Sequence, residues 1–376
     1  ILTFIPYIYA SKEFYVNIIP LQHWLPFKDY FVIAGPCSAE SEEQVLSTAH
    51  SLKKIDEVKL FRAGIWKPRT RPNTFEGVGK KGLKWLQRVK KETGLKTCTE
   101  VASPSHIQAA LDQGVDVLWI GARTTVNPFL VQEMANYLKG KDVPIMIKNP
   151  INADLSLWIG AIERFYNAGI NKIIGIHRGF STSRPSPYRN EPLWKIPIEM
   201  RQKISSLPII CDPSHIAGTR EKIQELAQKA FDLAMSGLMI ETHPNPDKAL
   251  SDKQQQITPL QLLEMIKGLK LKKEFSKDRI FGDQLTVLRS KIDAVDKEII
   301  ELLKVRMNIV KDIGHEKSKQ NITALQKNRL NQLISERVLW GDSLNLPHDY
   351  IDEVFQVIHS ASVKKQTDLM NHRPLN

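Results

Sequence analysis

Residues 60–72 read Leu-Phe-Arg-Ala-Gly-Ile-Trp-Lys-Pro-Arg-Thr-Arg-Pro, and the prediction of the fold starts from this stretch. It begins as an apolar run of strand length and ends in a turn that two prolines stiffen. The turn carries several groups that bind anions: Lys67, Arg69, Thr70 and Arg71. Arg62 lies within the apolar part, where a cation needs a partner. Because guanidinium and ammonium groups suit phosphate and carboxylate oxygens, the stretch predicts a strand that leads into an anion site rather than a solvated basic loop.

Similar apolar runs recur along the chain and alternate with helix-length segments, at a spacing of about 30 residues. The predicted strands are 31–36, 59–65, 95–101, 115–122, 143–148, 172–177, 207–211 and 237–241. Their nearly continuous apolar character is typical of parallel strands buried on both faces. Eight such units predict an α/β fold, a TIM (β/α)8 barrel. A doubly wound sheet is the alternative, but no glycine-rich dinucleotide turn supports it.

The last quarter of the chain has a different pattern. Residues 284–319 contain no proline and repeat apolar residues at helical spacing, and shorter helical patterns follow at 324–339 and 348–370. The apolar stripe consists of Leu285, Leu288, Ile292, Val295, Ile299, Leu302, Ile309 and Ile313. A helix so long and so apolar on one face needs partners, including a second copy of itself. A small all-α domain is therefore predicted to follow the barrel.

These patterns divide the chain into four parts. We expect an N-terminal extension at 1–26, the barrel at 27–273, a charged linker at 274–283 and the helical domain at 284–376. The extension has no basic n-region and no cleavage site, so we do not expect a signal peptide, and its role stays open.

Composition narrows the possible partners. The 376 residues carry a formal net charge of +12, which suits nucleic acid, an anionic membrane or anionic metabolites. No zinc-finger spacing or RNA-binding signature appears, and no apolar run is long enough to span a bilayer. Small anionic substrates are therefore expected. Three cysteines in this length argue against a disulfide framework and favour a reducing cytoplasm.

A barrel carries its chemistry at the carboxyl ends of its strands, and polar residues at these ends form two sets. The cations are Arg62, Lys67, Arg69, Arg123, Lys148 and Arg178, enough for two phosphorylated substrates. The second set is Cys37, His215, Glu241 and Asp252. Each of these alone has an ordinary structural role as a buried thiol, a cap or an ion-pair partner. Together they predict a site for a divalent metal, with Mn, Fe, Co and Zn all compatible.

Five ordered motifs carry a family resemblance: Gly35-Pro-Cys-Ser38, Lys67-Pro-Arg-Thr70, Gly121-Ala-Arg123, Asp212-Pro-Ser-His215 and Ser251-Asp252. From about residue 31 to residue 273 the sequence resembles the 3-deoxy-D-arabino-heptulosonate 7-phosphate (DAHP) synthase family. That family joins phosphoenolpyruvate to erythrose 4-phosphate and releases phosphate, at the entry to the shikimate pathway.

The resemblance implies a role for each residue of both sets. It implies that the metal, with Mn²⁺ favoured, is bound by Cys37, His215, Glu241 and Asp252. It places around phosphoenolpyruvate the cations Arg62, Lys67, Arg123, Lys148 and Arg178. It directs Arg69 and Thr70 toward erythrose 4-phosphate. Lys67 is also the candidate proton donor to the new alkoxide, with a water on the metal as the alternative.

Arg306 interrupts the apolar stripe of the long helix, and Lys317 lies about three turns further along the same face. Arg306 alone would suit a snorkelling side chain, but two such cations favour a buried anion. Over residues 284–370 the sequence resembles the all-helical class of chorismate mutase, through residues at family spacing: Arg289, Arg306, Lys317, Ser362 and Gln366. The resemblance implies conversion of chorismate to prephenate, with cations on the carboxylates and with Lys317 and Gln366 at the ether oxygen. It also implies a dimer in which Arg289 acts across the subunit boundary.

One block departs from that family, which has an Asp followed by an Arg-Glu pair where this chain has Ala324, Lys327 and Asn328. The carboxylate for the substrate hydroxyl is missing, although Asn328 or Gln326 is available to hydrogen-bond it. We therefore expect a mutase that is weaker than the free-standing family. We also expect the helical domain to mediate feedback inhibition of the barrel.

Two alternatives remain open at this point. One is a related synthase that combines phosphoenolpyruvate with another phosphosugar. The other makes the helical domain a non-catalytic dimerisation or regulatory module, although a dimer seam does not require Arg289, Arg306 and Lys317. A dimer through this domain is the expected assembly, with a tetramer also compatible.

Overall fold

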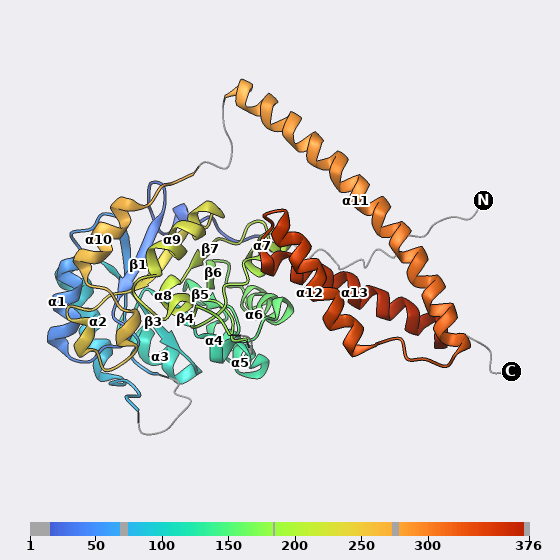
Figure 1. Ribbon diagram of the computed structural model, residues 1–376. Helices are drawn as coiled ribbons and strands as arrows, with labels where there is room; N and C mark the ends of the chain where they lie inside the picture. The colour runs from blue at the N-terminus through green and yellow to red at the C-terminus, as the bar shows by residue number, and fades with distance from the viewer. Residues whose placement is uncertain (1–15, 68–73, 183–184, 273–277, 372–376) are drawn as a thin grey trace. The chain divides into compact units, whose positions relative to one another are not determined.

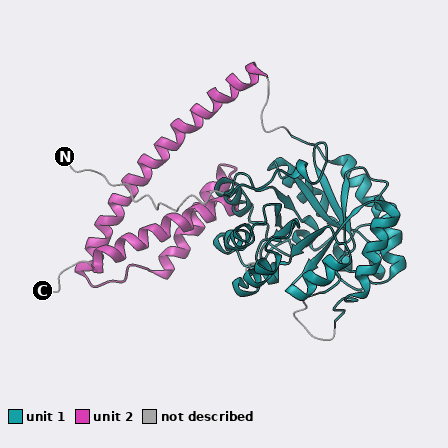
Figure 2. Ribbon diagram, turned by 180° about the vertical axis from the view of Figure 1, so that it is seen from behind, with its two compact units in different colours: residues 1–274 teal, residues 275–376 magenta. Residues whose placement is uncertain are grey.

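The structure is a computed structural model that describes residues 16–67, 74–182, 185–272 and 278–371. The chain forms two compact units, residues 1–274 and residues 275–376 (Figure 2). No helix in the described part of the chain has both the length and the apolar character that crossing a membrane requires.

Eight parallel strands close into a barrel in the first unit, with β8 paired to β1 (Figure 1). The strands are β1 (Phe31–Gly35), β2 (Val58–Arg62), β3 (Lys96–Val101), β4 (Val117–Ile120), β5 (Ile145–Lys148), β6 (Ile173–His177), β7 (Ile209–Cys211) and β8 (Gly237–Glu241). Each predicted run overlaps one of these strands. The predicted TIM barrel is confirmed.

Helices surround the strands and provide the outer layer of the barrel (Figure 1). They are α1 (Glu42–Leu52), α2 (Lys81–Thr93), α3 (Pro104–Asp112), α4 (Ala122–Thr125), α5 (Pro128–Leu138), α6 (Leu155–Asn167), α7 (Lys195–Lys203), α8 (Pro213–Ala217), α9 (Ile223–Asp232) and α10 (Pro259–Gly268). Short 3₁₀ helices are η1 (Leu21–His23), η2 (Pro246–Lys248) and η3 (Lys253–Gln255). Several helices begin at side-chain caps, as where the side chain of Ser103 accepts a hydrogen bond from the backbone N–H of His106 in α3.

The barrel has two apolar cores because successive strand side chains point to opposite faces. In β1, Phe31 and Ile33 belong to the cluster inside the barrel, whereas Val32 and Ala34 belong to the cluster between strands and helices. Leu21 and Leu25 also join the inner cluster. The described end of the predicted extension is therefore part of the barrel core, while residues 1–15 lie outside the described part.

The second unit consists of α11 (Arg279–Lys319), α12 (Lys327–Ser343) and α13 (His348–Asn371), and α13 packs against both other helices. The long helix starts earlier than predicted because the Asp278 side chain accepts hydrogen bonds from the backbone N–H groups of Ile280 and Phe281. Residues 279–283, predicted as part of the linker, are thus helical.

Only the C-terminal part of α11 is covered within this unit. Val310 and Gly314 are buried, but Leu288 and Ile292 of the apolar stripe are 55% and 59% exposed. Ile309 and Ile313, in the C-terminal part of the stripe, are also 55% and 43% exposed, so most of the predicted stripe lies outside the face that α12 and α13 cover.

Candidate functional site

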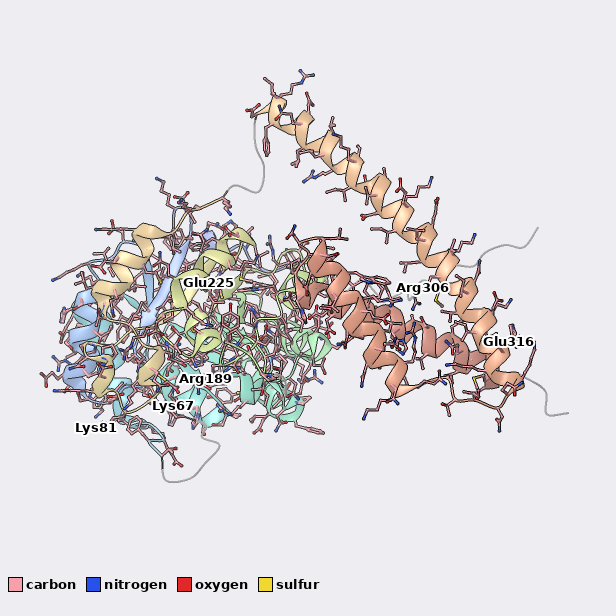
Figure 3. The ribbon with its side chains drawn as sticks, in the orientation of Figure 1. Lys67, Lys81, Arg189, Glu225, Arg306 and Glu316 are labelled. Carbon is pink, nitrogen blue, oxygen red and sulfur yellow. The ribbon has the colours of Figure 1, made fainter. Side chains whose placement is uncertain are left out.

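A cavity of about 480 Å³ lies at the mouth of the barrel where the strands end at their carboxyl termini. Because all eight strands run in parallel, residues far apart in sequence meet at this rim. The lining includes many of the predicted site residues: Lys67, Arg123, Lys148, Arg178, His215 and Asp252. Figure 3 labels Lys67 together with Arg189, which also lines the cavity.

Arg62 is 1% exposed and does not line the cavity itself, but it contacts the buried Glu241 beside it. Its Nη2 donates to Oε1 of Glu241 at 3.0 Å, and its guanidinium carbon lies 5.0 Å from the centre of the Trp119 ring. Burial alone would lower the pKa of Arg62, but Glu241 and Asp212 outweigh burial and raise it. Nε and Nη1 are buried without a partner among the described residues. Unsatisfied buried donors are costly, so this guanidinium is suited to receive an anion.

Lys148, Asp212 and His215 form a buried polar group beside Arg62. Nζ of Lys148 donates to Oδ2 of Asp212 at 2.8 Å, and Nδ1 of His215 lies 2.8 Å from the same oxygen. Burial alone would raise the pKa of Asp212, but His215 and Lys148 hold it well below its usual range. Nε2 of His215 lies 3.7 Å from Oε1 of Glu241, so the imidazole lies between the carboxylates of Asp212 and Glu241. Asp212 is part of a motif that was recognised in the sequence, but no role was predicted for its carboxylate.

Three of the four predicted metal ligands converge beside this group. One donor atom each from Cys37, Glu241 and Asp252 lie within 4.8 Å of one another. His215 is outside that group, and its Nε2 lies 3.7 Å from Oε1 of Glu241. The Cys37 thiol donates to Oδ2 of Asp252 at 3.1 Å, and Nζ of Lys67 donates to Sγ of Cys37 at 2.8 Å. A thiol, two carboxylates and an imidazole suit a divalent transition metal, so these residues fit such an ion.

The charges of this cluster follow from its burial. Burial and the nearby Glu241 carboxylate raise the pKa of the Cys37 thiol to about 12, although Lys67 acts in the opposite direction. Burial alone would lower the pKa of Lys67, but Cys37, Glu241 and Asp252 outweigh burial and raise it. Burial alone would raise the pKa of Asp252, but Lys67 and Arg189 hold it well below its usual range. At neutral pH the thiol and the ammonium therefore keep their protons beside two carboxylates.

The loop after β6 fixes two further arginines. Nη1 of Arg178 donates to Oδ1 of Asn190 at 2.7 Å, and its backbone N–H donates to Oδ1 of Asn149 at 2.7 Å. Arg189 donates to Asp252 and was missed by the sequence analysis, because it lies in an irregular loop with no periodic pattern. The predicted residues Arg69 and Thr70 lie outside the described residues.

The helical unit gathers a second set of predicted residues. Nη1 of Arg306 donates to Oγ of Ser362, and Nζ of Lys317 donates to the carbonyl oxygen of Ala324 at 2.7 Å. Gln366 is buried, and its Oε1 has no partner among the described residues. Arg289 and Asn328 are exposed and do not join this group within the described chain.

His359 lies near this group of polar residues and was not predicted from the sequence. It lies one turn before Ser362 on α13, and its Nε2 is buried without a partner among the described residues. Burial lowers the pKa of His359, and Arg306 and Lys317 lower it further. The helical spacing of His359, Ser362 and Gln366 is the signal that was available in the sequence.

Each of the two units matches a known protein family. The model of the DAHP synthetase I family matches residues 28–277, and that of chorismate mutase type II matches residues 288–367. A phospho-2-dehydro-3-deoxyheptonate aldolase of Thermotoga maritima is 32% identical over 268 residues, which cover 70% of this chain and 77% of the relative. A 2-dehydro-3-deoxyphosphooctonate aldolase of Vesicomyosocius okutanii is 29% identical over 64% of this chain and 89% of the relative.

Solved structures give the same result. The crystal structure of the Thermotoga maritima DAHP synthase superposes with a TM-score of 0.58 at 32% identity, covering 63% of this chain and 67% of that one. A truncated form of the same enzyme gives 0.55 at 30% identity, covering 63% and 84%. The chain therefore belongs to the DAHP synthetase I family and is a multifunctional enzyme that joins a DAHP synthase barrel to a chorismate mutase domain of type II.

Proposed function

We propose that the barrel condenses phosphoenolpyruvate with erythrose 4-phosphate and that the helical domain rearranges chorismate to prephenate. The observation that carries the first reaction is the meeting of Arg62, Lys148 and Arg178 with the Cys37, Glu241 and Asp252 cluster around one barrel mouth. Two mutually repelling anionic substrates need such a cationic surround to approach each other.

Phosphoenolpyruvate is assigned to the cationic side of the cavity. The unpartnered donors of Arg62 suit one of its anionic groups, and the other proposed contacts are Lys67, Arg123, Lys148 and Arg178. Arg69 and Thr70 remain the proposed contacts of erythrose 4-phosphate, from outside the described residues.

Cys37, His215, Glu241 and Asp252 are proposed to hold a divalent metal, for which Mn²⁺ is favoured. When bound, such an ion acts as a Lewis acid that polarises the aldehyde for attack by C3 of the enol. Nζ of Lys67 holds a proton next to this cluster, because its pKa is raised. We assign Nζ as the donor of that proton to the alkoxide that forms as the carbon–carbon bond closes, while water adds at C2 of the former enol and phosphate leaves from that carbon. Three buried free thiols suit a reducing cytoplasmic location.

The barrel assignment is tested with purified protein and both substrates. EDTA is expected to abolish DAHP formation, Mn²⁺ to restore it, and Cys37→Ala to block the restoration. Full activity of the chelated enzyme refutes the metal assignment. Replacing erythrose 4-phosphate with a five-carbon aldose phosphate tests the alternative that the octonate-forming relatives suggest. Faster turnover of the five-carbon sugar would favour that alternative.

The mutase assignment rests on two cations of α11: Arg306, which contacts Ser362 of α13, and Lys317, which contacts Ala324 between α11 and α12. A pericyclic rearrangement needs conformational restraint and charge complementarity, which Arg306, Lys317 and Gln366 are suited to supply. Incubation with chorismate, followed by identification of prephenate, tests it. Tight binding without turnover would favour the purely regulatory module.

A dimer through α11 is proposed because the stripe around Leu288 and Ile292 is exposed and Arg289 lies on the same uncovered part of the helix. Ile292→Glu is expected to dissociate the dimer and to lower mutase activity, whereas Lys291→Glu, one residue earlier, keeps both. Analytical ultracentrifugation measures the mass. A monomeric wild-type protein refutes the assignment.

Feedback inhibition is proposed to act through occupancy of the mutase site. Synthase activity is compared with and without prephenate, in the full chain and after deletion of residues 284–376. Inhibition is expected only in the full chain. Equal inhibition of both forms ends this proposal.

A further inference from the structure

Gln255 connects the two carboxylates of the proposed metal site. It is 1% exposed and lies at the end of η3, in the loop that follows β8. Its Nε2 donates to Oε2 of Glu241 at 2.7 Å, and its Oε1 accepts from Nη1 of Arg189 at 2.6 Å. The same Nη1 donates to Oδ1 of Asp252 at 2.9 Å. A continuous path of hydrogen bonds thus runs from Glu241 through Gln255 and Arg189 to Asp252.

This path fixes one oxygen of each carboxylate. Glu241 uses Oε2 for Gln255 and Oε1 for Arg62, so its carboxylate plane is held from both sides. Asp252 uses Oδ1 for Arg189 and turns Oδ2 toward the Cys37 thiol. The backbone of Asp252 is in the left-handed region, with φ of 45°, which is uncommon for residues other than glycine. Arg189 and the Cys37 thiol hold its side chain.

We propose that Gln255 and Arg189 are positioning residues that hold Glu241 and Asp252 in the orientation that binds the metal. The inference rests on the metal assignment under Proposed function. Partners that orient metal ligands typically change metal affinity by about 10–100-fold when they are removed. The two act in series, so the loss in a double variant is expected to be smaller than the product of the single losses.

The alternative is that these residues only anchor the loop. Arg220 anchors the same loop without touching a proposed ligand: its Nε donates to the carbonyl oxygen of Gln256 at 2.8 Å and its Nη2 to that of Lys253 at 2.7 Å. Arg220→Met is therefore the matched control.

The test titrates Mn²⁺ into the metal-free full-length protein and measures free Mn²⁺ by electron paramagnetic resonance. Gln255→Leu and Arg189→Met are each expected to weaken binding by about 10–100-fold, and Arg220→Met by less than about threefold. Gln255→Asn and Arg189→Lys replace any variant that does not fold, as judged by circular dichroism.

The outcomes separate the two proposals. If the wild-type protein binds Mn²⁺ and the Gln255 and Arg189 variants bind it with the same affinity, the positioning role is overturned and the metal assignment stands. An equal loss in Arg220→Met also overturns it, in favour of simple loop anchoring. Absence of Mn²⁺ binding by the wild-type protein overturns the metal assignment and this inference with it.

Discussion

Lys148→Met should cost the barrel far more stability than the loss of an ordinary lysine. Lys148 and Asp212 are 2.8 Å apart, with side-chain exposures of 5% and 0%. At an effective dielectric constant of about 20, two unit charges at that distance attract by about 6 kcal/mol. Two effects reduce the net loss: the substitution also removes the free-energy cost of desolvating the ammonium, and Asp212 keeps His215 as a neighbour. The expected net loss is therefore about 3–5 kcal/mol, as for other broken buried pairs.

Urea unfolding of the full-length protein measures this loss. Tryptophan fluorescence reports mainly on the barrel, because Trp340 is the one tryptophan outside residues 1–274. A lower midpoint at an unchanged slope reports a change in stability alone. Lys172→Met is the control, since Lys172 pairs with Asp142 at side-chain exposures of 21% and 77%. Its expected loss is at most about 1 kcal/mol.

A second variant identifies the cause. Adding Asp212→Asn to Lys148→Met removes the stranded carboxylate and should recover part of the stability. If Lys148→Met loses no more stability than Lys172→Met, the buried-pair reasoning is wrong. If the double variant recovers nothing, the loss came from packing rather than from charge.

Acid unfolding tests in which pH range the Lys148–Asp212 pair stabilises the folded state. The pKa of Asp212 is held well below its usual range in the folded state, so its contribution is present above the usual carboxyl pKa. That contribution is lost as pH falls through the folded-state pKa. In the Lys148→Met variant, the loss of stability on acidification should therefore begin at a higher pH.

Three further predictions concern the backbone, the metal and the mutase. Gly35→Ala should prevent folding, seen by circular dichroism, because its Cβ would lie 2.0 Å from the carbonyl oxygen of Arg62 at φ of 145°. Metal affinity should rise about tenfold per pH unit near neutrality, measured by Mn²⁺ titration, because the Cys37 thiol must release its proton to bind. Arg306→Met should lower the kcat/KM of the mutase by about 10²–10³-fold and leave synthase activity intact.

Each of these has a control. Gly114→Ala should still fold, because its φ of 72° is strained but its Cβ meets open space. Cys37→Asp should flatten the pH dependence of metal affinity, and a slope that persists would place the released proton elsewhere. Lys319→Met changes an exposed charge near the end of α11 and should leave the mutase unchanged. A loss equal to that of Arg306→Met would contradict a specific role for Arg306.

The sequence by itself was enough to predict the barrel and most of the residues that meet at the carboxyl ends of its strands. Strand and helix periodicities are local properties of the chain, so the eight βα units and the long helix could be read without coordinates. Parallel strands that close on themselves must bring their carboxyl ends together, so Lys67, Lys148 and Asp252 were expected at one rim.

Only the tertiary structure decided which side chains pair. Arg62 meets Glu241 across 179 positions of sequence, and Gln255 joins Glu241 to Arg189, and no periodic pattern marks such partners. Leu21 and Leu25 were assigned to an extension, yet they complete the inner core, because the apolar lumen they fill exists only once the barrel has closed. Pairing and enclosure depend on distances through space, and these are set only when the chain has folded.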